Sequence, residues 1–304
     1  MPRALIVKEY GGPEQSALVD VPTPSPAAGQ LLVAVRAAGV NPVDWKTREG
    51  QLRVFRPLDL PAVLGNEASG VVEAVGPEVA GFAPGDEVFG ATAEAGLSEY
   101  ALLEADSTAH KPTEVPFTAA ATLPIAAMAA YNAVARVQPG PEDVVVVTGA
   151  AGGVGVAVLQ LLRHRGARVI GTASEPKHVL LEKLGAEPVA YGKGVRGRIE
   201  ALAPTGITAI IDTVGGDALR HVAPLLADAS RLVTVADPVV ARELGGAMVS
   251  RHRPSAALIE LAELVVRGVL DPCITATYPL DRAADALAEV QSGHVTGKVV
   301  ITVP

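Results

Sequence analysis

The chain has 304 residues, of which 49% are hydrophobic and 19% charged, a composition too apolar for a disordered protein. Its 33 acidic and 25 basic side chains give a net charge of −8, which argues against nucleic acid as the main partner. The single cysteine, Cys273, excludes an intrachain disulfide and a cysteine-based metal cage, and fits a reducing, cytoplasmic location. We also expect no membrane segment, on the criterion of ~18 consecutive apolar residues.

The first part of the chain, residues 1–116, has the pattern of an all-β module. Short runs of β-forming residues lie at 4–7, 31–36, 71–76 and 82–89, with Gly-rich and Pro-rich turns between them. Such spacing predicts a barrel or a sandwich.

From residue 117 the pattern changes to strands that alternate with helices. A helix is predicted over 117–137, with an interruption at Pro124, and four consecutive valines predict a strand at 144–147 that is covered on both faces. A helix at 154–165 and strands at 168–170, 209–211 and 231–235 follow, which indicates a doubly wound α/β sheet. The chain ends with a strand at 274–277, a helix at 281–291 and a strand at 298–303.

A glycine-rich loop joins the valine strand to the next helix. Backbone amides at such a helix N-terminus, with no side chains in the way, predict a pyrophosphate site. The residues expected to form it are Gly149, Ala150, Ala151, Gly152, Gly153, Val154 and Gly155. The second glycine of the usual fingerprint is Ala here, and the alternative is a tight strand-to-helix turn that binds no nucleotide.

The end of the second strand of this region bears on the choice of dinucleotide. Ser174 stands where an NAD-binding protein carries an acidic residue, and Lys177 and Tyr191 add donors that suit a 2′-phosphate. We therefore expect NADPH rather than NADH. Glu175 argues against this choice unless it points to solvent, and the alternative for Lys177 is a solvated lysine at a helix start.

Several motifs together resemble one superfamily. They are the segments AAGVNPVDWKTREG at 37–50, VLGNEASGVV at 63–72, PGDEV at 84–88, the glycine loop at 149–155, and GHVTGK at 293–298. In this order they closely resemble the medium-chain dehydrogenase/reductase superfamily, and within it the zinc-independent quinone oxidoreductase branch, also called zeta-crystallin-like.

The resemblance implies a GroES-like β-barrel domain and a Rossmann domain with a doubly wound parallel sheet. The barrel would comprise residues 1–116 and 267–304, and the NADPH-binding Rossmann domain residues 117–266. It also implies an active site between the domains and a homodimer.

Zinc is not expected. Zinc-dependent relatives would carry a cysteine at Asn41, a histidine at Asn66 and a four-cysteine lobe after the turn at 85–86, and this chain has none of these. Six scattered histidines and one cysteine form no close-spaced ligand set either. Alcohol dehydrogenation is therefore not expected. Glu67 resembles a catalytic carboxylate, but a structural hydrogen-bonding role is the favoured interpretation.

The reaction expected is hydride transfer from NADPH to a small hydrophobic quinone or to an α,β-unsaturated carbonyl compound (EC 1.6.5 or 1.3.1 type). Negative charge then develops on oxygen, and the Asn41 amide is the expected hydrogen-bond donor to it. A turn cap is an equal alternative for Asn41. Trp45, the only tryptophan, forms either a wall of the substrate cleft or part of the core.

The remaining expectations concern the cofactor. By resemblance, Thr122 lies near the nicotinamide, and Lys298 is the family's closing lysine near the cofactor, with a surface lysine as the alternative. Val214, Thr234 and Ala236 end later strands and are expected to line the cofactor cleft. The competing hypothesis for function is a non-catalytic NADPH-binding protein of the same fold, acting as a sensor, a structural protein or an RNA-associated factor.

Overall fold

A computed structural model describes the backbone of residues 1–304 and every side chain except that of Glu94. Its internal contacts divide the chain into two compact units. Unit 1 comprises Met1–Ile125, Arg253–Val266 and Ile274–Pro304, and unit 2 comprises Ala126–His252 and Arg267–Cys273. The domain boundaries expected at 116 and 266 remain predictions.

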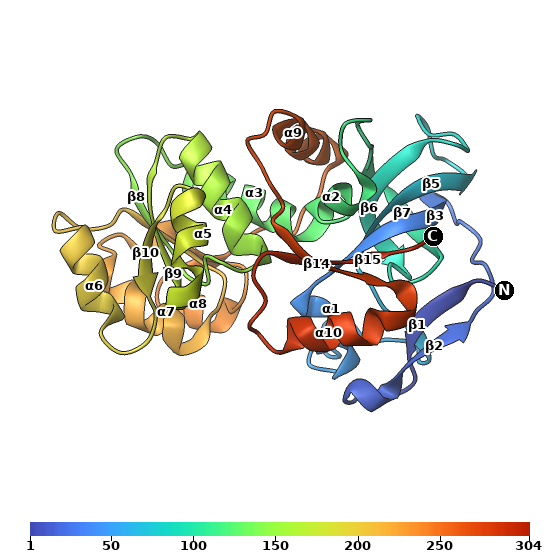
Figure 1. Cartoon of the computed structure of the whole chain (residues 1–304), viewed down its shortest axis with the longest axis horizontal. Coiled ribbons are helices and arrows are strands. Elements are labelled where there is room, and N and C mark those ends of the chain that lie inside the picture. Colours follow the sequence, from blue (N-terminus) through green and yellow to red (C-terminus); the bar gives the residue numbers. More distant parts are fainter. The chain divides into compact units, whose positions relative to one another are not determined.

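Unit 1 contains two sheets. The smaller has the order β2-β1-β4, with β1 at Arg3–Val7, β2 at Ser16–Asp20 and β4 at Ala62–Val63. The larger has the order β14-β15-β3-β5-β6-β7, with β14 at Ile274–Pro279, β15 at Lys298–Thr302, β3 at Gln30–Val40, β5 at Glu67–Val75, β6 at Glu87–Glu94 and β7 at Tyr100–His110. An additional pairing of β3 with β7 closes β3, β5, β6 and β7 into a ring. The C-terminal strands β14 and β15 thus extend a barrel built by the N-terminal part of the chain (Figure 1).

The helices of unit 1 are few. They are α1 at Pro42–Arg48, α2 at Phe117–Ala120, α9 at Ser255–Val266 and α10 at Ala283–Gln291, with short turns η1 at Pro13–Gln15 and η6 at Leu280–Arg282. The π-helical turn η2, Leu123–Ala127, leads into unit 2. Leu5, Leu31, Leu103 and Leu287 are among the fully buried residues of the barrel core.

Some local expectations for unit 1 were wrong. Helix α1, with Asn41 as its N-cap, was not anticipated; Pro42 occupies its first turn, and the Asp44 carboxylate accepts the Asn41 backbone N–H at 2.7 Å. The strand expected at 82–89 begins only at Glu87, since residues before it form a turn in which Asp86 accepts the Ala83 N–H. Strands β2 and β7 were not anticipated.

Unit 2 contains one parallel six-stranded sheet. Its order is β10-β9-β8-β11-β12-β13, with β8 at Val144–Val147, β9 at Arg168–Ala173, β10 at Glu187–Ala190, β11 at Ala209–Asp212, β12 at Leu232–Thr234 and β13 at Ala247–Met248. Its helices are α3 at Met128–Val137, α4 at Gly153–His164, α5 at His178–Lys183, α6 at Val195–Leu202, α7 at Gly216–Val222 and α8 at Pro238–Glu243, with short turns η3 at Glu175–Lys177, η4 at Ala223–Leu225 and η5 at Ala229–Arg231. The chain therefore alternates strands with helices as predicted (Figure 1).

The sheet of unit 2 is covered on both faces. Val146, Ile170 and Ile210 form one core with residues of α6, α7 and α8, while α3 and α4 pack against each other and contact β9, β11 and β12. Val145 and Val147, which alternate with Val146, are also fully buried. The run of four valines is the buried central strand expected of a parallel sheet. The fold class, a GroES-like barrel plus a doubly wound Rossmann-type sheet, is confirmed.

One stretch does meet the length criterion for a membrane span, contrary to the sequence analysis. The described residues contain a helical stretch, Phe117–Val137, that is long and apolar enough to cross a membrane. In its most apolar window, 67% of the residues are buried inside the protein. Because a core helix has the same length and composition, this stretch carries no argument for a membrane.

Candidate functional site

The residues expected to bind the dinucleotide in unit 2 gather at one edge of its sheet. The glycine loop follows β8, Ser174 follows β9, Tyr191 follows β10, Val214 follows β11, and Thr234 ends β12. These five strands are parallel and neighbours in the sheet, so their carboxyl ends meet at one edge. This is where open α/β sheets bind ligands.

The glycine loop forms the tight turn that its sequence predicts. Gly149 has φ +62°, and a Cβ there would lie 2.5 Å from Thr213 Oγ1 and 2.7 Å from Val214 Cγ2. At Gly155 a Cβ would lie 2.6 Å from the Ala150 carbonyl carbon. Gly149 therefore needs glycine for its backbone conformation and for packing, and Gly155 needs it for packing, whether or not a ligand binds.

Gly152, the cap of α4, has a different reason to be glycine. A Cβ there would meet only Gly149 O, at 3.4 Å, so the space beside the helix end is open. The first bond of the helix runs from Val156 N–H to Gly152 O, and Gly153, Val154 and Gly155 present the amides that precede it. An open cradle of amides at a helix N-terminus fits a diphosphate.

The segment after β9 lies beside this cradle, because Ala150 N–H donates to Thr172 O at 3.0 Å. Ser174 caps the turn η3, Glu175–Lys177, and both Ser174 and Lys177 are half-buried, whereas Glu175 is exposed. Burial lowers the pKa of the Lys177 ammonium below its usual value. Tyr191 is 62% exposed. A hydroxyl and an ammonium thus lie just beyond the carboxyl end of β9.

Asp212 is a buried carboxylate at this edge of the sheet that the sequence analysis did not single out. It is fully buried at the end of β11, and its Oδ1 accepts Thr148 Oγ1 at 2.5 Å, Val214 N–H at 3.1 Å and Gly215 N–H at 3.0 Å. Its Oδ2 accepts Thr234 Oγ1 at 2.6 Å. One carboxylate therefore ties together the ends of β8, β11 and β12.

Two of the predicted cofactor residues lie at turns that Asp212 holds. Thr234 is fully buried, and its hydroxyl donates to Asp212 while it accepts the N–H groups of Ala236 and Asp237 at 3.0 and 3.1 Å. Its side chain shapes the turn after β12. Val214 is 54% exposed, with its backbone held by Asp212.

The other predicted site residues, Asn41, Trp45, Thr122 and Lys298, belong to unit 1. Asn41 and Lys298 lie together: Lys298 Nζ donates to Asn41 Oδ1 at 2.7 Å and to Glu67 Oε1 at 3.0 Å. Asn41 Nδ2 donates to the same Glu67 oxygen at 2.7 Å, and Glu67 Oε2 accepts the Ile125 N–H at 2.8 Å. Lys298 is buried, so the interpretation as a surface lysine was wrong, whereas Glu67 is hydrogen-bonded as expected of a structural carboxylate.

A second buried carboxylate, Asp44, continues this polar cluster. Asn66 Nδ2 donates to Asp44 Oδ1, and the exposed Arg56 donates to Asn66 Oδ1. Burial raises the pKa of Asp44 to about 6, and the hydrogen bonds from Asn41 and Asn66 oppose the shift. The cluster thus runs from the surface to the buried ammonium of Lys298.

Trp45 and Thr122 face protein in this structure. Trp45 packs against the barrel core, and its indole N–H is buried without a partner. Thr122 is 1% exposed, and its hydroxyl donates to Ala119 O at 2.7 Å. Contacts of Trp45 with a substrate and of Thr122 with the cofactor stay predictions.

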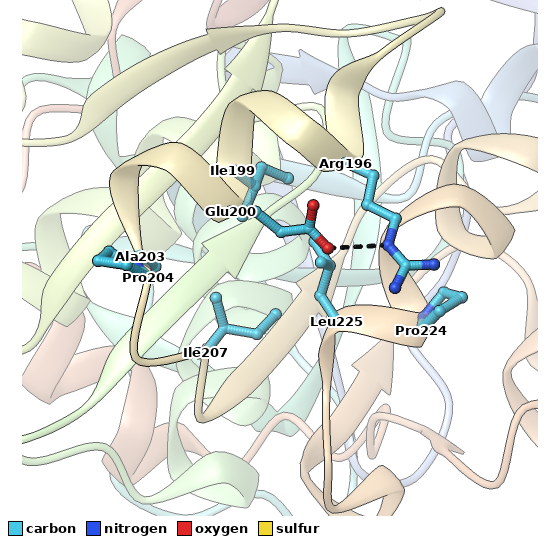
Figure 2. A pocket seen from close by; sticks show the side chains of 9 residues that line it. Arg196, Ile199, Glu200, Ala203, Pro204, Ile207, Pro224 and Leu225 are labelled. Atoms are coloured by element: carbon cyan, nitrogen blue, oxygen red, sulfur yellow. Dashed lines mark hydrogen bonds and ion pairs between the residues drawn. The ribbon is translucent and has the colours of Figure 1, made fainter.

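A hollow of about 210 Å³ lies elsewhere in unit 2. Its lining comes from α6, the segment before β11 and the turn η4, and it includes Arg196 and Glu200 of α6, which form an ion pair at 3.0 Å (Figure 2). Segments that precede β11 and β12 lie at the amino edge of the sheet, opposite the glycine loop. The described side chains include no group of three or more His, Cys, Asp or Glu arranged to hold a metal ion.

Comparisons with known proteins agree with this geometry. Residues 27–139 match the family model "Alcohol dehydrogenase GroES-like domain", and residues 184–301 match "Zinc-binding dehydrogenase". The chain is 34% identical to a human quinone oxidoreductase, over 98% of this chain and 97% of that protein. It is 30% identical to a chloroplastic quinone oxidoreductase of Triphysaria versicolor, over 98% of each chain.

Solved structures give the same result. A quinone oxidoreductase from Coxiella burnetii superposes with a TM-score of 0.91 at 30% identity, over 100% of this chain and 99% of that one. A mycobacterial protein in complex with NADPH superposes with a TM-score of 0.88 at 29% identity, over 99% and 100%. The chain belongs to the medium-chain dehydrogenase/reductase superfamily, in its quinone oxidoreductase branch. These similarities support an oxidoreductase that uses a nicotinamide cofactor.

Proposed function

We propose that the protein is a zinc-independent oxidoreductase that transfers hydride from NADPH to a quinone or to an α,β-unsaturated carbonyl compound. The observation that carries the proposal is the open amide cradle at Gly152, with Ser174 and Lys177 at the end of the neighbouring strand. The NADPH complex of the mycobacterial relative supports the same cofactor.

The residues of this chain have distinct roles in that proposal. The amides of Gly153, Val154 and Gly155 hold the diphosphate, and Ser174 and Lys177 hold the 2′-phosphate. When bound, NADPH supplies a hydride, so the protein has only to orient the reactants and to stabilise charge on the acceptor. The Asn41 amide supplies a hydrogen-bond donor to the acceptor oxygen, where negative charge develops.

Zinc independence rests on the chemistry of the buried cluster of unit 1. Asn41 and Asn66 are neutral amides that hydrogen-bond Lys298, Glu67, Asp44 and Arg56. The Lys298 ammonium, 2.7 Å from Asn41 Oδ1, repels a divalent cation at that place. An acceptor that is already electrophilic needs no Lewis acid.

Two further parts of the proposal rest on the single cysteine and on the resemblance. A reducing, cytoplasmic compartment suits a chain whose only thiol is Cys273. A homodimer is proposed from the family, and light scattering on the purified protein measures it directly.

The test is a turnover assay of NADPH against a panel of quinones and enones, with and without a chelator. NADPH consumption that survives chelation is the expected result. Tight NADPH binding without reduction of any acceptor would favour the non-catalytic alternative. Alcohol oxidation that stops on chelation would overturn both.

A further inference from the structure

We propose that Lys298 is a positioning residue for Asn41: its ammonium fixes the amide so that one Nδ2 hydrogen remains for the acceptor oxygen. The inference rests on the proposed function, and it assigns Lys298 a role other than contact with the cofactor.

The first step is the hydrogen-bond capacity of Lys298. An ammonium has three N–H donors, and Nζ has three acceptors: Asn41 Oδ1 at 2.7 Å, Glu67 Oε1 at 3.0 Å and Val40 O at 3.3 Å. Its side chain is only 4% exposed. All donors are used within the barrel, so none remains for a phosphate or a ribose.

The second step is the orientation of the Asn41 amide. The Lys298 ammonium only donates, so the atom that faces it is the amide oxygen. Glu67 Oε1 accepts from the Lys298 ammonium and also faces the amide, so the amide atom that faces it is the donor Nδ2. A flipped amide would place two donors together at Lys298 and two acceptors together at Glu67, which costs free energy in a buried site.

The third step is the hydrogen that is left. Asn41 Nδ2 carries two hydrogens, and Glu67 takes one of them. Lys298 holds the oxygen on its own side, and the second Nδ2 hydrogen has no partner among the described side chains. A donor is what a carbonyl or quinone oxygen needs as it gains negative charge.

The fold holds this arrangement from several segments. Val299 of β15 pairs with Val40 of β3, which places Lys298 beside Asn41. Glu67 begins β5 and also accepts the N–H of Ile125, in the turn that follows Thr122. A Cβ at Gly39 would overlap the Glu67 carboxylate, so glycine permits the close approach.

The chain offers a matched control for a substitution at Lys298. Lys111 is also in unit 1, its side chain is likewise 4% exposed, and its Nζ has three acceptors: Glu87 Oε2 at 2.9 Å, Pro112 O at 3.0 Å and Val115 O at 2.9 Å. Lys111→Met therefore removes a buried, paired ammonium without touching Asn41.

The experiment compares Lys298→Met with Lys111→Met in NADPH binding and in acceptor turnover. We expect Lys298→Met to leave the NADPH Kd within about twofold of wild type and to lower kcat about tenfold, as for groups that orient a functional residue. Lys111→Met should leave both unchanged. A rise in the NADPH Kd of Lys298→Met, with the NADH Kd unchanged, would show a phosphate-binding lysine and overturn the proposal.

A double variant guards against misfolding of Lys298→Met, which leaves Glu67 buried without its cation. Lys298→Met with Glu67→Gln removes both charges, and should regain thermal stability while kcat stays low. Wild-type kcat in this double variant would contradict a positioning role.

A measurement without an acceptor separates this inference from the proposed function. In ¹⁵N-asparagine-labelled protein, the Asn41 Nδ2 hydrogen bonded to Glu67 should exchange more slowly than the other one, and Lys298→Met should shift both signals while Lys111→Met leaves them in place. Unaltered Asn41 signals in Lys298→Met would overturn the inference, even if the wild-type protein reduces no acceptor and the proposed function fails.

Discussion

Asp212→Asn should weaken both the fold of unit 2 and its affinity for NADPH. The substitution keeps the shape of the side chain but replaces one acceptor oxygen with a donor. Oδ1 serves three donors and Oδ2 serves only Thr234, so the amide nitrogen takes the place of Oδ2. It then faces the Thr234 hydroxyl.

Thr234 has no capacity to adapt to that change. A hydroxyl has one hydrogen and two lone pairs, and both lone pairs already accept N–H groups, from Ala236 and Asp237. A charge-assisted bond of 2.6 Å is lost and a buried donor is left unpaired, which together cost about 2–4 kcal/mol. That is a large part of the 5–15 kcal/mol by which domains are stable. The NADPH Kd should rise about tenfold, because the turns at Val214 and Ala236 lose their anchor.

Urea unfolding followed by circular dichroism measures the first effect, and quenching of fluorescence by NADPH measures the second. Thr234→Val is the matched variant at the other end of the bond. In the double variant the two losses should not add, because both remove the same contact. An unfolding free energy of Asp212→Asn within ~0.5 kcal/mol of wild type would refute the reasoning.

Three further predictions concern single positions. Gly155→Ala should lower Tm, since its Cβ would lie 2.6 Å from the Ala150 carbonyl carbon. Gly152→Ala should keep Tm and raise the NADPH Kd about tenfold, because its Cβ enters the open cradle. Scanning fluorimetry measures the two Tm values and titration with NADPH the two Kd values, and equal Tm losses would contradict this prediction. Lys177→Ala should raise the NADPH Kd about tenfold and the NADH Kd less than twofold, and equal losses for the two coenzymes would remove the 2′-phosphate argument. Burial raises the pKa of Asp44 from its usual 3.8 to about 6, so between these values the folded state binds more protons than the unfolded state. The unfolding free energy should therefore fall by about 2 kcal/mol as the pH rises from about 4 to about 6, and Asp44→Asn should flatten that slope in urea titrations. Parallel curves for the two proteins would contradict the assignment.

The alternation of strands and helices after residue 117 was predictable from the sequence. The buried strand of four valines and the loop at Gly149 are local signals, since apolar runs and turn glycines act on the segment that contains them. Strands β2, β7 and β10 escaped prediction because their sequence patterns are weak, and β7 also depends on its pairing with the distant strand β3. Helix α1 is so short that its capping at Asn41 and Asp44 determines it.

The carboxyl edge of the sheet was also predictable in outline, because parallel strands place the residues that follow them at one edge. The hydrogen-bond partners of individual side chains were not predictable. Thr234 serves Asp212, 22 residues away, and Lys298 serves Asn41, 257 residues away. The amino-acid sequence alone determined the fold class and the glycine turn after β8, which depend on local conformation. Only the tertiary structure decided which buried polar groups are paired, because a buried donor takes whatever acceptor the packed chain places within its reach.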